Sequence, residues 1–545
     1  MAEKLKHRSM MRGGWTALAA GAMVLVGTAA WAADETPKHG GIAVIGTDGS
    51  GLTTLNSHAT SATPVLMVSD LWADGLFARD GKGKKVPHIA TSWDISPDQK
   101  TYTFHLRAGL KWSDGKPFSS ADVVFTLKDV AKFNTYQTQM LPNMESVEAP
   151  DANTVVVTLK APLAAALEGF DKEVLPLMPK HIYEGTDVLQ NPANRNPVGL
   201  GPYKLQAFEQ GRSLTFVRNP NYWDQPKPYL DGLVVAIITD TQQQINALLQ
   251  GEIDFVKLPY TQVARVQEAA KATGKVFARQ VEVSAPERAS LDFNMRKPPF
   301  DNQKVRQAVF HAMDRTRIIS DAYHGFAFLA TNAIPAQFTE LSDPSVDYGK
   351  LYPHDVAKAG KLLDEAGFPL VNGKRFTVDL TYSASVFNRS TFEPIAQILA
   401  AQWKEVGIET TLSGLDDQLW IDKVYKQNNF DVSLVSLTGR TDPTLGVDRS
   451  FLCNPNKLPY VNPSGYCNPE LDAIAAKANG AAAADRKQFY KTYEEIVARD
   501  LNEISMTNVP TFHGFSTRFE ALHTQFDVSF NEYPNWAEVW LKNGK

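Results

Sequence analysis

The pattern of hydrophobic positions changes near residue 300. Before it, short runs alternate apolar and polar residues, as in 101–106 (TYTFHL) and 153–160 (NTVVVTLK). A period of two is typical of strands with one buried face. Residues 201–223 fit a hairpin that turns at Gly211. The first half of the chain is therefore predicted to be rich in antiparallel strands.

After residue 302 a helical period appears. Residues 355–367 and 392–407 are predicted helices that end in glycine, and predicted strands follow at 375–383 and 408–415. Another helix is predicted from a stripe of apolar residues, namely Val305, Ala308, Val309, Ala312, Ile318 and Ile319. Alternation of strand and helix indicates a three-layer α/β region.

The stretch 40–52 (GGIAVIGTDGSGL) places an apolar run before Gly46, Gly49 and Gly51. A P-loop needs a lysine after its last glycine, and none follows Gly51. The glycine spacing is G-x-x-G-x-G, whereas dinucleotide-binding folds use G-x-G-x-x-G. The stretch is better interpreted as a strand and a glycine turn. Such a turn is either a simple bend or a place where backbone N–H groups approach a ligand.

The first 32 residues are predicted to be a secretory signal peptide. A basic start is followed by an uncharged, alanine-rich run at 13–33, and Ala30-Trp31-Ala32 fits the A-x-A cleavage pattern. Cleavage after Ala33 and a membrane anchor are the alternatives, and the run is short for an anchor. No cysteine lies near the cleavage site to carry a lipid. We therefore expect an exported, soluble protein.

Length and charge exclude several classes of protein. Removing residues 1–32 takes four of the 55 Lys+Arg and one of the 60 Asp+Glu, which leaves a net charge of −8. An acidic chain lacks the basic field typical of nucleic-acid binding. The remaining chain is longer than the roughly 250–300 residues that one core supports, so we expect at least two lobes.

The sequence shows no motif for catalysis or for a metal or cofactor. No two of the 11 histidines lie within five residues of each other, and no G-x-S-x-G motif occurs. Asp416-Asp417 is interpreted as part of a solvated face. We therefore predict a protein that is not an enzyme.

The two cysteines, Cys453 and Cys467, lie in one polar loop. A local disulfide is expected in an oxidising compartment. Two free thiols are the alternative.

Three passages carry a resemblance to a known family. They are 87–127, with "LRAGLKWSDG" and "ADVVFT", 199–224, with "GPY" and "RNPNYW", and 291–315, with "FN", "PF", "VRQA" and "DR". Together they resemble the extracytoplasmic solute-binding proteins of ABC transporters, family 5, the peptide and nickel binding group. The matching passages run in the family's order along nearly the whole mature chain.

The resemblance implies a bilobal α/β fold of the class II, cluster C type, with a hinge between the lobes. Lobe I would comprise residues 33–295, with an extra subdomain at about 70–200, and lobe II residues 296–505. Residues 506–545 would return to lobe I. The solute would be trapped as the lobes close. We expect a periplasmic monomer that docks on a permease at the inner membrane.

Ligand residues are inferred from the same resemblance. Peptide-binding relatives carry, after an "FDV" strand, an aspartate that binds the peptide's ammonium. Here that position falls on Gly439 or Arg440, so the segment from Thr438 to Arg440 is a candidate site that lacks the acid. Arg440 is either a fork for a solute carboxylate or a solvated loop residue. Asp442 either substitutes for the missing acid or forms a turn with Pro443.

Further candidates are weaker. Gly49, Ser50 and Gly51 would offer backbone donors to the solute. Trp420 is either a cleft aromatic or part of a packed helix face. Phe512 and His513 match ligand-facing positions loosely.

The predicted solute is a small peptide or a peptide-like molecule. The Cys453/Cys467 loop is similar to a disulfide loop of dipeptide-binding relatives, which supports this choice. The missing acid leaves open a non-peptide, carboxylate-bearing solute, such as an opine, a glycoside or a metal chelate.

Overall fold

The strand β1 (Ile42–Thr47) pairs in parallel with β10 (Gly232–Ile237) and β11 (Phe255–Leu258) inside a seven-stranded sheet. The complete order across this sheet is β12 (Val276–Val281), β19 (Thr511–Ser516), β11, β1, β10, β9 (Ser213–Arg218) and β8 (Tyr203–Glu209). The hairpin predicted around Gly211 is confirmed as β8 and β9, in which Glu209 lies opposite Ser213.

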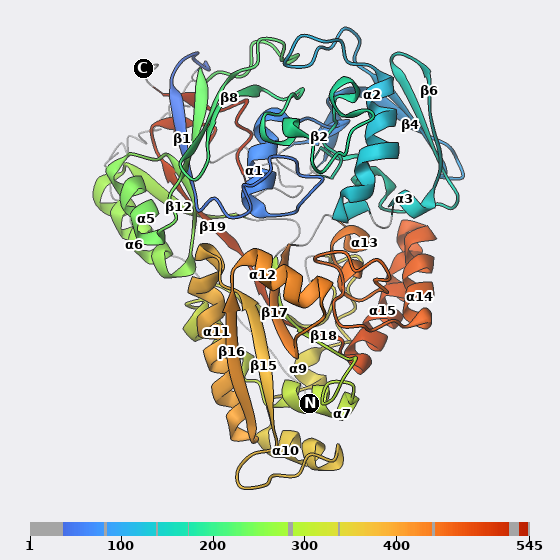
Figure 1. Ribbon diagram of the computed structural model, residues 1–545, viewed down its shortest axis with the longest axis vertical. Helices are drawn as coiled ribbons and strands as arrows, with labels where there is room; N and C mark the ends of the chain where they lie inside the picture. Colours follow the sequence, from blue (N-terminus) through green and yellow to red (C-terminus); the bar gives the residue numbers. More distant parts are fainter. Residues whose placement is uncertain are drawn as a thin grey trace, which may run out of the picture. The chain divides into compact units, whose positions relative to one another are not determined.

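Two helices connect strands of this sheet. The helix α5 (Thr241–Gln250) begins at Asp240, whose carboxylate accepts the backbone N–H of Gln243 at 2.8 Å. The helix α6 (Tyr260–Thr273) follows β11 and leads into β12. Figure 1 shows α5 and α6 beside the β12 and β19 side of the sheet.

The alternating segments between residues 90 and 160 form a separate four-stranded antiparallel sheet. Its order is β4 (Ala90–Ile95), β5 (Thr101–Leu106), β7 (Thr154–Leu159) and β6 (Met144–Asp151). Every second residue of β5 is buried, which confirms the period of two. The helix α2 (Ser120–Phe125) begins after Ser119, whose backbone N–H donates to the carboxylate of Asp122 at 2.9 Å.

The second half of the chain builds a six-stranded sheet. Its order is β14 (Phe328–Leu329), β18 (Glu503–Val509), β13 (Glu287–Phe293), β17 (Val432–Thr438), β15 (Phe376–Ser383) and β16 (Ile408–Leu415). The helices predicted at 355–367 and 392–407 are confirmed as α10 (Val356–Glu365) and α11 (Val386–Glu405). The single helix predicted from the stripe that runs from Val305 to Ile319 is divided: α7 (Gln303–His311) ends before Asp314, which caps a second helical segment that carries Ile318 and Ile319. In Figure 1, α11 runs along β16. Trp403 of α11 is fully buried in the core of this region.

The chain passes between the two large sheets twice. It leaves the seven-stranded sheet between β12 and β13, and returns at Pro510, between β18 and β19. The lobe limits predicted at residues 295 and 505 do not coincide with these crossings, because β13 and β18 both belong to the six-stranded sheet. The sequence is strand-like on both sides of each crossing, so hydrophobic pattern alone did not locate them. The division into lobes stays a prediction.

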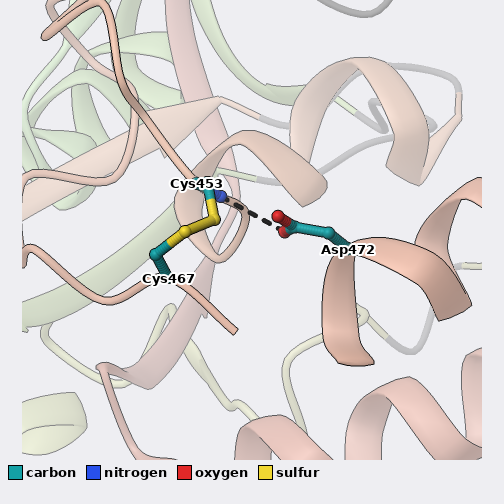
Figure 2. A group of neighbouring side chains, drawn as sticks. All are labelled: Cys453, Cys467 and Asp472. Carbon is teal, nitrogen blue, oxygen red and sulfur yellow. Dashed lines mark hydrogen bonds between the residues drawn. A yellow bond between two sulfur atoms is a disulfide. The ribbon is translucent and has the colours of Figure 1, made fainter. Parts of the chain in front are cut away.

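The disulfide predicted in the polar loop is present. Cys453 and Cys467 are bonded, with their Cα atoms 4.6 Å apart. Figure 2 shows the backbone N–H of Cys453 pointing at Asp472 of α14 (Pro469–Gly480), where it donates to Oδ1 at 3.3 Å. Both sulfur atoms are consumed by the disulfide, so this trio does not offer thiolate ligands to a metal.

The computed structural model describes residues 36–80, 84–137, 140–172, 174–281, 287–335, 338–438, 442–522 and 533–542. The predicted signal peptide, residues 1–32, lies outside these ranges. Within them, no helix combines the length and apolar character that crossing a bilayer requires. Residues 38–545 make up one compact unit.

Further elements of the described part of the chain are the 18-residue helix α15 and several short helices and strands. They are α3 (Met140–Asn143), α4 (Lys180–Tyr183), α8 (Arg315–Arg317), α9 (Tyr348–Leu351), α15 (Ala483–Asp500), β2 (Phe77–Arg79), β3 (Lys85–Pro87), β20 (Phe519–Glu520) and β21 (Trp540–Leu541).

Candidate solute-binding site

The glycine turn after β1 brings Asp48 and Ser50 to a cavity. Gly49 and Gly51 have φ values of +75° and +74°, a region that side chains disfavour. A Cβ atom on Gly49 would lie 2.7 Å from Cγ2 of Ile237, so the turn also needs glycine for space. Asp48 Oδ1 accepts hydrogen bonds from the Ser50 N–H at 3.0 Å and from its hydroxyl at 2.6 Å. These bonds fix the direction of the Asp48 carboxylate.

The cavity is lined by elements of both large sheets. Its empty volume is about 1250 Å³, part of which is open to solvent. From the seven-stranded side it receives the β1 turn, the start of α1 (Thr63–Trp72) and the β11 residues Phe255, Val256 and Lys257. From the six-stranded side it receives the ends of β15 and β17 and the helix α12 (Asp417–Ile421). A ligand in this space would contact both sheets at once.

Two carboxylates from different sheets face this cavity. Asp48 follows β1, and Asp417 begins α12, directly after β16. The hydroxyl of Ser383 donates to Oδ1 of Asp417. Burial, followed by the negative charges of Asp48 and Asp416, raises the pKa of Asp417. The Oδ2 atom of Asp48 is sealed from solvent and has no hydrogen-bond donor among the described residues.

Cationic groups lie elsewhere on the cavity wall. Arg449, of the short helix Asp448–Ser450, is only 4% exposed, and its guanidinium carbon lies 5.1 Å from the ring centre of Tyr136. Lys257 and Glu287 form an ion pair at 3.8 Å.

Tyr460 connects the acidic and basic parts of the wall. Burial raises its pKa most strongly, the charge of Asp417 raises it further, and Arg449 lowers it. Tyr460 is therefore close to both charges.

Trp420 both lines the cavity and packs into an aromatic cluster. Its indole N–H donates to Ser433 Oγ at 3.1 Å, and the side chain is 3% exposed. Its ring centre lies 5.4 Å from that of Tyr425 and 5.8 Å from that of Tyr460. Both alternatives considered for Trp420 thus describe part of its environment.

The profile of the bacterial extracellular solute-binding proteins, family 5 (middle region), matches residues 84–457 of this sequence. The chain belongs to this family. Family 5 proteins are binding proteins and not enzymes, which confirms the prediction made from the absence of catalytic motifs. The chain is accordingly a bacterial extracellular solute-binding protein.

The relatives of this family 5 protein are named after, or solved with, different solutes. The glutathione-binding protein GsiB of Escherichia coli O1:K1 / APEC is 28% identical over 512 residues, which cover 90% of this chain and 92% of GsiB. The protein AgaA of A. tumefaciens R10, solved with agropinic acid, has a TM-score of 0.80 at 23% identity and covers 92% of this chain and 99% of its own.

A dipeptide-binding protein of Pseudoalteromonas sp. SM9913, solved with Met-Leu, has a TM-score of 0.81 at 21% identity. The match covers 92% of this chain and 100% of that one. The two structural matches confirm the predicted α/β fold of periplasmic binding proteins.

Two of the three predicted backbone donors of the β1 turn, those of Gly49 and Ser50, have partners inside the turn. The N–H of Gly49 donates to Thr47 Oγ1 at 3.3 Å, and that of Ser50 donates to Asp48. Ser50 lines the cavity, whereas Gly49 and Gly51 shape the turn beside it. In this family 5 protein the turn therefore presents side chains to the cavity.

Phe512 and His513 lie in β19, behind the cavity wall. His513 is fully buried, 4.9 Å from the ring centre of Phe255 and 5.8 Å from that of Tyr533, and both of these neighbours line the cavity. Burial, followed by the charge of Lys257, lowers the pKa of His513 well below its usual value. Phe512 packs on Phe326, with ring centres 4.8 Å apart. The structure thus places both residues in the core beside the cavity.

The candidate segment after β17 is only partly described: Asp442 belongs to the described residues, whereas Gly439 and Arg440 do not. Thr438 ends β17, and its side chain, Gly439 and Arg440 lie outside the described part of the chain. Asp442 is 8% exposed, and its two oxygens accept hydrogen bonds from Arg486 at 2.7 and 2.8 Å. Asp442 also caps α13 (Pro443–Gly446) by accepting the N–H of Thr444 at 3.0 Å. Its carboxylate is therefore occupied inside the fold.

Of the predicted site residues that the structure describes, only Ser50 and Trp420 line the cavity, and the wall residues that sequence reasoning missed include Asp48, Asp417, Arg449 and Tyr460. The interpretation of Asp416-Asp417 as a solvated face holds for Asp416, which is exposed and caps α12 at 3.0 Å, but is wrong for Asp417. The position of Asp417 directly after a predicted strand was the available signal, because ligands of α/β folds gather at the ends of strands.

Proposed function

We propose that this family 5 protein captures a small peptide or peptide-like zwitterion in the periplasm and delivers it to the permease of an ABC importer. One observation supports the solute class: a single cavity, reached from both large sheets, carries Asp48 and Asp417 on one part of its wall and Arg449 on another. A solute with an ammonium and a carboxylate group complements both signs of charge.

Capture would involve no covalent chemistry. The charged groups of the wall would orient the solute, and the aromatic rings of Trp420 and Tyr460 would bury its apolar parts. We propose further that the protein acts as a monomer without a lipid anchor, with the lobes closing on the solute and opening at the permease.

Arg440 remains a proposed contact for a solute carboxylate. If that contact is charge-assisted, Arg440→Ala should weaken binding of the dipeptide Met-Leu by about 1.5–3 kcal/mol. Calorimetric titration measures the change, and an unchanged affinity would remove Arg440 from the site.

A non-peptide, carboxylate-bearing solute is the second candidate. It is favoured by the absence of an acid at the Gly439 and Arg440 positions, and agropinic acid in AgaA is an example of such a ligand in a similar fold. This candidate also uses the cationic part of the wall.

Native mass spectrometry of the mature protein, purified without refolding, tests the proposal. A retained mass of a di- or tripeptide supports the peptide class, and a retained organic acid or sugar conjugate supports the second candidate. Titration with di- and tripeptides then measures affinity. Failure of every peptide to bind, together with a retained non-peptide mass, would overturn the peptide assignment.

A further inference from the structure

We propose that Asp48 and Asp417 together receive a primary ammonium group of the solute, and that this ammonium is what allows the two sheets to enclose it. The inference rests on the proposed function and specifies which wall residues recognise the cationic end. Neither residue lies in the segment from Thr438 to Asp442, in which the resemblance to peptide-binding relatives implies the contact with the ammonium group.

The first support is the origin of the two carboxylates. Asp48 is held by the turn after β1 of the seven-stranded sheet, and Asp417 is held by α12 after β16 of the six-stranded sheet. Both line one cavity, and the charge of Asp48 contributes, after burial, to the raised pKa of Asp417. Bringing the two sheets together without a cation therefore brings two like charges together, which opposes closure.

The second support is the supply of free acceptor atoms. Asp48 Oδ1 is occupied by Ser50, but its Oδ2 is sealed from solvent with no donor among the described residues. A buried carboxylate oxygen without a donor is unfavourable unless a ligand supplies one. No Lys or Arg of the described chain forms an ion pair with Asp48 or Asp417.

The third support is the chemistry of the cation. Two carboxylates and the Ser383 hydroxyl offer few oxygen ligands for a hard metal ion, which takes six to eight in the case of Ca²⁺. A primary ammonium has three N–H donors and needs only a few acceptors. The surrounding aromatic side chains of Trp420 and Tyr460 further suit an organic cation.

The other charged groups near Asp48 and Asp417 do not neutralise the two carboxylates. Asp416 adds negative charge from the exposed start of α12. Lys257 is paired with Glu287, and the guanidinium of Arg449 lies over the ring of Tyr136. The negative part of the wall is therefore centred on Asp48 and Asp417.

Calorimetry with Met-Leu and N-acetyl-Met-Leu tests the inference on the full mature protein. Acetylation removes the ammonium and keeps the rest of the dipeptide. We expect wild type to bind Met-Leu about 10- to 100-fold more tightly than N-acetyl-Met-Leu. In Asp417→Asn and Asp48→Asn, affinity for Met-Leu should fall to that of the acetylated form.

Asp416→Asn is the matched control, because it removes the same charge from the neighbouring residue outside the cavity. Its affinity for Met-Leu should stay within about twofold of wild type. Thermal unfolding establishes that each variant is folded.

Three results would overturn the inference in different ways. Equal affinity of wild type for the two dipeptides would refute the ammonium site but would not contradict the proposed peptide-binding function. A loss of affinity in Asp416→Asn as large as in Asp417→Asn shows a general charge effect and removes the site. Binding of neither dipeptide by wild type overturns the proposed peptide function and this inference with it.

Discussion

Asp442 and Asp417 lie in the same half of the chain, yet the fold treats their carboxylates in opposite ways. Arg486 binds both oxygens of Asp442, and these bonds outweigh the effect of burial, so the pKa of Asp442 is lowered. Asp417 accepts a hydrogen bond from the hydroxyl of Ser383 and has no Arg partner of this kind among the described residues, and burial raises its pKa. The difference indicates that a carboxylate with an internal role is neutralised by the fold. One that faces a binding cavity keeps its charge available.

The largest effect is expected when Arg486, the cation that is paired with Asp442, is removed. Arg486→Met should lower the free energy of unfolding by about 3–5 kcal/mol, because it leaves Asp442 buried and uncompensated. Chemical denaturation measures the loss. Arg499→Met is the matched control, since Arg499 lies on the same helix, α15, in a half-exposed pair with Asp500, and should cost at most about 1 kcal/mol. Equal losses in the two variants would contradict a structural role of the Asp442 pair.

Asp448, whose pKa is affected by the charge of Asp442, should make the stability of the protein depend on pH. Asp448 is fully buried, and burial, followed by the charge of Asp442, raises its pKa from 3.8 to about 7. Between these values the native state holds a proton that the unfolded state releases, so stability falls as pH rises through this window. The fall is at most about 4 kcal/mol for a shift of this size.

Denaturation at pH 5 and pH 8 measures this effect. Asp448→Asn should flatten the profile, while Glu494, whose burial raises its pKa to about 8, leaves part of the slope. The lowered pKa of Asp442 acts in the opposite sense, and its stabilisation is lost only as the solution becomes acidic. Parallel profiles for wild type and Asp448→Asn would show that Asp448 does not titrate in this range.

The elements that the sequence predicted well are those with a local cause. The strand at 101–106 follows from a period of two, and the hairpin at 201–223 follows from alternation around one glycine. The helices α10 and α11 follow from a helical period that ends at glycine. Each of these signals lies within a few residues, so it is visible without the fold.

The cavity wall is different, because its charges come from distant parts of the chain. Nothing near Asp48 indicates that Asp417 will line the same cavity, and nothing near Asp442 indicates that Arg486 will neutralise it. Adjacent aspartates at 416 and 417 look alike in the sequence, although one caps α12 at the surface and the other lines the cavity. Which carboxylate meets a cation is decided by the packing of separate strands and helices.

The disulfide provides a third, smaller test. It closes the loop that carries Tyr460, the side chain close to both Asp417 and Arg449. The bonded residues are 14 positions apart, and a loop of this length contributes about 3 kcal/mol. The double variant Cys453→Ser/Cys467→Ser should lose stability of that order in denaturant unfolding. A reductant should then have no further effect on the variant, while it lowers the stability of wild type to the same level. If reduced wild type keeps its full stability, the disulfide does not constrain the loop.

The smallest change in stability is expected for Asp417→Asn, and its sign distinguishes Asp417 from the structurally paired Asp442. Asp417→Asn keeps an acceptor for Ser383 and removes a charge that burial, Asp48 and Asp416 all disfavour. We therefore expect the ligand-free protein to gain up to about 1 kcal/mol in the free energy of unfolding at pH 8. The gain should vanish near pH 3, where a carboxyl of raised pKa is already protonated in both states.

Asp416→Asn, at the exposed position, should change stability by no more than about 0.5 kcal/mol at either pH. A loss in Asp417→Asn comparable to that of Arg486→Met would mean that the fold itself supplies a cation to Asp417. The carboxylate would then be a structural group like Asp442, and the cavity would have no charge to offer a solute ammonium. A gain in the absence of solute, combined with weaker binding of Met-Leu, is the pattern of a residue whose charge costs stability and serves the ligand.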